Sequence, residues 1–287
     1  PIAGATGSIY AVPANAASVG NYSVDVTNTA GTTTSALTPL RATTASDPGR
    51  IVNFSIRANA GTGAQTLIIG FSGSASAEAP LLARGIGPSL VPLGVNGAMS
   101  DPRLQVFWFQ PGGTGISGPT LHGENDNWET AGPAVRTVGA QVLAFPLAAG
   151  SRDAAVVLTS LREDRYTLHI TPATGGPGVA LGELFDAAPA GSGARGLSNV
   201  SARTQVAPGE NTLIAGFVIG GTTARTVLIR AAGPILGTFG VTGTHADPMR
   251  RGRCPATFSP FWPRSRKSPV HTLPFRRTRR PRTRSRT

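Results

Sequence analysis

Cysteine is almost absent from the sequence, because Cys254 is its single example. One thiol excludes a disulfide framework or a cysteine metal cluster within one chain. The sequence also lacks any apolar run near the roughly 18 residues that a bilayer requires, so we expect no membrane span. Long helical patterns are missing too. The chain starts at Pro1 without a signal-like segment, and we interpret it as part of a longer protein whose signal peptide lies elsewhere.

Acidic residues are absent from residues 250–287, which hold 13 of the 26 basic residues. The other 249 residues carry 13 Arg and 14 acids, a formal charge of −1, so the net charge of +12 belongs to the tail alone. We expect an irregular tail that is read out of frame, because its composition changes abruptly at Arg250. The alternative is a polybasic arm that binds nucleic acid or anionic surfaces. On the first interpretation, nucleic acid is not an expected partner.

Glycine (37) and proline (24) are abundant, and 40% of the residues are apolar. This composition is typical of many short β-strands joined by tight turns. We therefore expect an all-β protein of antiparallel β-sandwich or jelly-roll-like modules. The length of 287 residues has room for about two domains.

An internal repeat organises the chain. The segment 81–102, LLARGIGPSLVPLGVNGAMSDP, recurs at 227–248 as VLIRAAGPILGTFGVTGTHADP, 146 residues later. The same offset relates further shared positions, among them Asn53, Ser55, Arg57, Gly70 and Phe71 to Asn199, Ser201, Arg203, Gly216 and Phe217. A fixed period of this length indicates a duplicated domain.

The repeat sets the expected domain boundaries. A first copy covers 51–188 and an incomplete second copy covers 196–249, separated by a linker at 189–195 and preceded by another at 41–50. In the first copy the patterns predict strands at 51–58, 65–72, 80–86, 104–110, 140–147, 153–160, 164–171 and 178–186. Residues 51–102 and 197–248 are expected to share one backbone trace.

Residues 1–40 contain a predicted hairpin. Tyr22, Val24 and Val26 alternate with polar residues, and the turn sequence NTAG at 28–31 follows them. The run ASVGNYSVDVTNTAGTTTSA resembles the last hairpin of a bacterial immunoglobulin-like domain. The resemblance implies a tyrosine corner at Tyr22, with Ser18 in place of the usual Asp.

The longer pattern also resembles a known family. The motifs are LLARGIGPSL, GENDNW (123–128), GSRDAAVVL (150–158), DRYTLHI (164–170) and GVALGELFD (178–186). Together they resemble a repeated, uncharacterised β-domain of Verrucomicrobia-type surface proteins that follows immunoglobulin-like domains. The resemblance implies surface display and no assigned activity.

Catalytic signatures are scarce. None of His122, His169, His245 and His271 lies in a Ser/His/Asp or metal-ligand spacing, so we expect solvated histidines. Gly85-Ile86-Gly87 lacks the third glycine and the following helix of a dinucleotide site. We therefore expect no enzyme, no catalytic residue and no cofactor.

Four acids of the first copy could meet at loop ends: Glu124, Asp126, Asp153 and Asp186. A calcium loop at 123–127 is conceivable but lacks the regular Asp-x-Asp-x-Asp spacing, so no metal site is predicted. The alternative is an Asx-type turn that feeds Trp128 into the core.

The duplicated polar residues carry more information. Arg84 and Asp101 recur as Arg230 and Asp247, each pair 17 residues apart across a Gly-Pro turn. We predict a structural Arg–Asp bridge in each copy, with a ligand-binding arginine as the alternative.

These patterns favour a non-catalytic structural or adhesive module of a secreted or cell-surface bacterial protein. Its partners would be surface glycans or other surface proteins. The alternative is a carbohydrate- or calcium-binding sandwich, which aromatics gathered on one exposed face, such as Trp108, Phe109 and Trp128, would favour.

Overall fold

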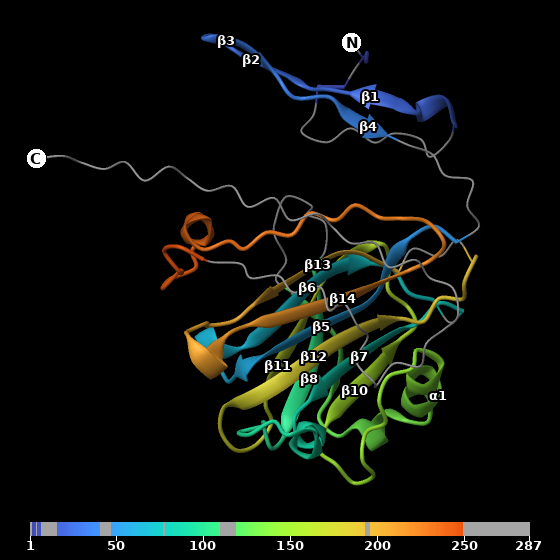
Figure 1. Ribbon diagram of the computed structural model, residues 1–287, viewed down its shortest axis with the longest axis vertical. Coiled ribbons are helices and arrows are strands. Elements are labelled where there is room, and N and C mark those ends of the chain that lie inside the picture. The colour runs from blue at the N-terminus through green and yellow to red at the C-terminus, as the bar shows by residue number, and fades with distance from the viewer. Residues whose placement is uncertain are drawn as a thin grey trace, which may run out of the picture.

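The computed structural model describes residues 2–3, 5–6, 16–40, 47–76, 78–109, 119–192 and 196–248 (Figure 1). The tail at 250–287 and the linker at 41–46 lie outside the described residues. The strands are β1 (Gly20–Tyr22), β2 (Asp25–Asn28), β3 (Gly31–Thr34), β4 (Thr38–Leu40), β5 (Arg50–Ala60), β6 (Leu67–Gly73), β7 (Leu81–Ile86), β8 (Pro102–Phe109), β9 (Thr120–Asn125), β10 (Ala154–Leu158), β11 (Asp164–Pro172), β12 (Gly178–Asp186), β13 (Leu197–Arg203) and β14 (Ile214–Gly220). The helices are α1 (Ala134–Gln141) and the short 3₁₀ helices η1 (Ala16–Ser18), η2 (Gly63–Gln65), η3 (Pro88–Leu93), η4 (Trp128–Ala131), η5 (Gly209–Asn211) and η6 (Pro234–Phe239).

The N-terminal segment forms the predicted hairpin. β2 pairs with β3 around the turn at 28–31, and β1 pairs with β4 beyond it. The Tyr22 hydroxyl donates a 2.7 Å hydrogen bond to the carbonyl of Ser18, four residues upstream. A tyrosine corner makes this kind of bond, from a strand tyrosine back to the preceding backbone.

The rest of the described chain is mostly β. Nine strands form one nearly closed, antiparallel, barrel-like sheet in the order β10-β7-β12-β5-β13-β6-β11-β8-β9, and β14 adds to β5. The outermost strands meet where the Ala155 amide of β10 donates to the Asn125 Oδ1 of β9, at 3.0 Å. The sheet therefore confirms the all-β class at the level of a mostly β, antiparallel fold.

Seven of the eight predicted strands are present, and the strand predicted at 140–147 is wrong. Its first residues end helix α1, and the remainder is a loop. The helix forms because Val135 and Val138, three residues apart, are both buried on one face. The alternating apolar residues of 140–147 misled the prediction. Strand β9, whose sequence TLHGEN has little β propensity, was not predicted.

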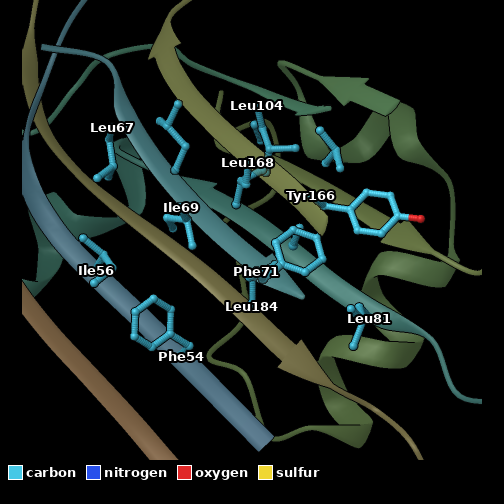
Figure 2. Close-up of a cluster of buried hydrophobic side chains, with 14 of the residues drawn as sticks. Phe54, Ile56, Leu67, Ile69, Phe71, Leu81, Leu104, Tyr166, Leu168 and Leu184 are labelled. Carbon is cyan, nitrogen blue, oxygen red and sulfur yellow. The ribbon is translucent and has the colours of Figure 1, made fainter. Parts of the chain in front are cut away.

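The main core fills the inside of the sheet (Figure 2). Alternate residues of β11 point inward: Tyr166, Leu168 and Ile170 are all buried. The rings of Phe71 and Tyr166 stack with centroids 5.4 Å apart. The Tyr166 hydroxyl also donates to the carbonyl of Arg162, four residues upstream, in the pattern seen at Tyr22.

A second cluster lies on the outer face of β7, β10 and β12, where α1 and η4 cover it. Its members are Leu82, Ile86, Leu90, Trp128, Val135, Val138, Leu147, Ala155, Phe185 and Ala187. Because both faces of β7 are covered, all six of its residues are buried.

The repeat is visible in local backbone geometry. Helices η3 and η6 occupy equivalent residues and end at Gly94 and Gly240, with φ of 80° and 76°. A Cβ on Gly87 would lie 2.0 Å from the Met99 carbonyl oxygen, and one on Gly233 would lie 2.0 Å from that of His245. The equivalence stops at 227–232: this segment is not a strand, although its counterpart is β7.

Candidate functional site at the seam between the repeats

Arg84 binds a different acid from the predicted one. Its Nε donates to Glu183 Oε2 at 2.9 Å, and its second guanidinium nitrogen donates to the Phe145 carbonyl at 2.7 Å. The guanidinium also lies 4.4 Å from the centroid of the Phe145 ring. Arg84 and Glu183 face each other across β7 and β12, and both are buried. The pair is a desolvated cross-strand bridge inside the outer cluster.

Asp101 therefore has other partners, and the predicted Arg84–Asp101 bridge is not formed. Thr174 donates its hydroxyl to Asp101 Oδ2, and Arg152 lies 3.4 Å from the same oxygen. The carbonyl of Asp101 accepts the Ala173 amide at 2.7 Å. Asp101 thus fixes the start of β8 to the loop after β11. Strand pairing separates two residues that the sequence keeps 17 apart.

The second copy differs again. Within the described chain, Arg230 and Asp247 form no ion pair with each other. Both are exposed, and the Asp247 amide donates to its neighbour His245 at Nδ1, at 3.3 Å. The repeated residues are therefore in different surroundings in the two copies.

Asp153 has the most hydrogen bonds of the four candidate acids, and it is fully buried. Its Oδ1 accepts the Gly87 amide at 2.8 Å, while Oδ2 accepts the hydroxyls of Ser89 and Ser151. It therefore attaches the start of β10 to the Gly-Pro turn that opens η3. The motif SRD at 151–153 was visible in the sequence, but its target, 66 residues upstream, was not.

The other candidate acids point elsewhere. Glu124 binds Arg103 and Gln105 on the surface, and the Arg103 hydrogen bond lowers its pKa. Asp126 accepts the side chain of Asn127. Among the described residues, no three His, Cys, Asp or Glu side chains come together in a way that could hold a metal ion.

The predicted aromatic face is not formed by its three members. Trp128 is 2% exposed in the outer cluster, where its indole donates to the Ser151 hydroxyl at 3.1 Å. Trp108 lies on β8 and donates to Asp164 at 2.9 Å. Arg136 covers the Trp128 ring at 4.3 Å. The turn before Trp128 thus leads it into a packed layer.

The histidines occupy ordinary positions. His169 is half-buried on the outer face of the sheet, 4.7 Å from the Phe107 ring, and burial together with the nearby Arg203 lowers its pKa. His122 approaches the Tyr166 ring edge-on at 5.9 Å. His271 lies outside the described residues.

The two repeats meet along two strand pairs. Strand β14 of the second copy pairs with β5 of the first, and β13 of the second pairs with β6 of the first (Figure 1). The pairs on one side are Arg57–Ile214, Ile56–Ala215, Ser55–Gly216, Phe54–Phe217 and Asn53–Val218. On the other side they are Arg203–Ile68, Ala202–Ile69, Ser201–Gly70, Val200–Phe71 and Asn199–Ser72.

These two registers are identical under the 146-residue offset. Both ladders also shift at the same place, between Leu197 and Asn199 on one side and between Val218 and Ile219 on the other. Ile51 and Leu197, which are themselves equivalent positions, face each other. Residue i contacts j while the equivalent of j contacts the equivalent of i, which is the rule of a two-fold interface.

A cavity of about 350 Å³ opens beside this seam. Its lining residues come from both copies and from the end of α1: Asp47, Arg50, Val52, Asn53, Gln141, Val142, Leu143, Phe185, Asp186, Ala187, Ala188, Ala190, Val218 and Gly221. Arg50 donates to Asp47 at 2.6 Å and to Asp186 at 3.0 Å, so the charged groups of the lining bind one another. Leu143 has a φ of 57°, an uncommon left-handed conformation for a branched side chain.

No helix in the described part of the chain has the length and apolar character that a membrane crossing requires. The chain matches no protein-family model, no curated protein and no solved structure.

Proposed function

We propose that the protein is a non-catalytic structural or adhesive module of a secreted or cell-surface bacterial protein. On this proposal the barrel-like sheet is a sandwich or jelly-roll-type unit of the Verrucomicrobia-type surface domain, which follows the end of an immunoglobulin-like domain. The second copy would be an incomplete unit, and residues 250–287 an out-of-frame tail.

One observation carries the proposal: the candidate acids are engaged in holding strands and loops together. Glu183 is bound by Arg84, Asp153 holds the η3 turn, and Asp186 is bound by Arg50. Catalysis by paired carboxylates needs two of them to converge on a substrate with different pKa values. Side chains already bound to internal partners favour a load-bearing role instead.

Beads coated with the full chain would test the adhesive role. We expect them to cluster with one another or to attach to protein-coated surfaces, equally in calcium and in EDTA. Beads coated with heat-unfolded chain are the control. Turnover of a glycosidic or ester substrate by the folded chain, or attachment that EDTA abolishes, would contradict the proposal.

A second candidate is the binding of a small polar ligand such as a glycan, and the cavity at the seam favours it. Filling it with Val218→Trp should remove any such binding, whereas Val206→Trp, at a position equally 39% exposed, should not. A glycan array with the two variants and the unchanged chain decides between the candidates. Equal glycan binding by both variants would place the ligand elsewhere.

A further inference from the structure

The edges of β5 and β6 hold the strands of the other repeat in a way that suggests exchange. Within one repeat, β5 and β6 follow each other with only η2 between them. Two antiparallel strands joined by a short connection normally pair as a hairpin. Here they do not: each pairs with the counterpart of its neighbour from the second copy.

The residues in contact would be the same in both arrangements. The pair Ser55–Gly216 replaces a hairpin pair Ser55–Gly70, and Ser201–Gly70 replaces Ser201–Gly216. Because serine and glycine occupy the same places in both copies, the register that pairs one copy with itself also pairs it with the other. Register is set by side-chain pattern, and this pattern does not distinguish the two.

The contact at this pair is close, and glycine makes room for it. A Cβ on Gly216 would lie 3.0 Å from Ser55 Oγ, and one on Gly70 would lie 2.5 Å from Ser201 Oγ. The same complementarity is thus present at both equivalent points of the seam. The second-copy strand also reaches the core, because Val200 and Ala202 pack against it.

We propose that the first two strands of the repeat form an exchangeable pair, and that β5 and β6 are a docking site for the equivalent strands of a second copy of the repeat. In this chain the site is filled by the second copy that follows it. The partner is therefore defined by chemistry: a strand pair with serine and glycine at the positions of Ser201 and Gly216 and the same register shift. Exchange of identical elements is a common route to association between repeated units.

This inference names a partner for the proposed structural role and rests on it only in that respect. Strand pairing is read directly by cross-linking, so it can fail while bead adhesion succeeds, and the reverse. The two results are therefore separable.

Cysteine pairs test the exchange in the full chain, after Cys254→Ser removes the single natural thiol. The exchanged arrangement places S55C beside G216C and S201C beside G70C. The hairpin arrangement would place S55C beside G70C and S201C beside G216C. Directly opposite strand residues bring Cβ atoms to about 4.5–5.5 Å, close to the separation that a disulfide spans.

We expect oxidation to give a disulfide in S55C/G216C and S201C/G70C, seen as a faster band on a non-reducing gel, and none in the other two double variants. A cross-linked dimer of S55C/G216C would also support the docking site, because it joins the same strands from two chains. Cross-linking of S55C/G70C or S201C/G216C would overturn the proposal. So would the absence of cross-links in all four variants. The four variants use the same four substitutions, so a variant that fails to fold is exposed by circular dichroism and replaced by its mirror pair.

Discussion

Leu82 and Leu228 are the same residue of the repeat, yet the first is fully buried and the second is 84% exposed. The same contrast holds for Phe71, which is 3% exposed, and Phe217, which is 39% exposed. The local backbone around the Gly-Pro turns is nearly equal in the two copies. Sequence therefore determines the turn, whereas the neighbouring strands determine burial: β7 lies between β10 and β12, and segment 227–232 pairs with no strand in the described residues.

This comparison explains why repeated polar residues need not repeat an interaction. Arg84 has its partner on β12, and β12 belongs to the first copy. Arg230 retains the residue type without that partner. Mutating equivalent positions in pairs therefore separates what the local sequence determines from what tertiary packing adds.

The largest difference is expected for the arginines. Arg84→Ala leaves Glu183 buried without its partner, which costs about 3–5 kcal/mol of unfolding free energy. Arg230→Ala removes an exposed side chain and should stay within about 0.5 kcal/mol. Urea denaturation of both variants measures the two values. Similar losses would show that the second copy has a buried bridge of its own.

A second control distinguishes the lost pair from the lost volume. The double variant Arg84→Met/Glu183→Leu keeps an apolar filling and removes both charges. We expect it to regain most of the stability that Arg84→Ala loses, since a buried pair replaced by apolar residues is often neutral. A double variant as unstable as the single one would assign the effect to packing.

Leu82→Ala should have the next largest effect. It opens a cavity in the outer cluster and should cost about 2–5 kcal/mol. Leu228→Ala should change stability by about 0.5 kcal/mol or less, because that side chain is mostly in water. The same denaturation experiment compares them. A loss of 2 kcal/mol or more for Leu228→Ala would mean that residues 227–232 are covered in solution.

The glycines should differ less, because their surroundings are alike. A Cβ at position 87 or 233 would meet a carbonyl oxygen 2.0 Å away, so the backbone must shift in both copies. Gly87→Ala should cost about 1–3 kcal/mol, the usual range for overpacking. Gly233→Ala should cost less, since the exposed turn around it can relax. Thermal unfolding measures the pair, and a larger loss at Gly233 would contradict the comparison.

The sequence predicted what depends on local pattern. Alternation in β11 and the apolar run of β10 placed these strands within a few residues, and the turn at 28–31 was also predicted. Helix α1 was missed because its apolar residues could be read with either period. These elements need only their own residues to be recognised.

The sequence did not predict what depends on contact between distant segments. Arg84 and Glu183 are 99 residues apart, and Gly87 and Asp153 are 66 apart. Nothing in the spacing distinguishes Glu183 from Asp101 as the partner of Arg84. The exchanged ladders were missed for a related reason: serine and glycine at these positions fit a hairpin within one repeat as well as a pairing between two.

The smallest effect concerns His169, where the two copies meet on the outer face. Its pKa is lowered first by burial and then by Arg203, which β13 of the second copy supplies. Removing that charge with Arg203→Gln should raise the pKa of His169, while burial keeps it below the ordinary value of about 6.5. Arg57→Gln, the equivalent change in the first copy, should leave it unchanged. An NMR titration of the imidazole measures the shift in each variant. The sign also fixes the pH dependence of stability. A lowered pKa in the folded state means that the unfolded chain binds the proton more readily. The contribution of His169 is therefore present above about pH 6.5 and is lost as the pH falls through the folded-state pKa. Arg203→Gln should make this loss smaller and Arg57→Gln should not. If Arg57→Gln moved the pKa as much as Arg203→Gln, the strand beside His169 would not be β13, and the seam would have to be arranged differently.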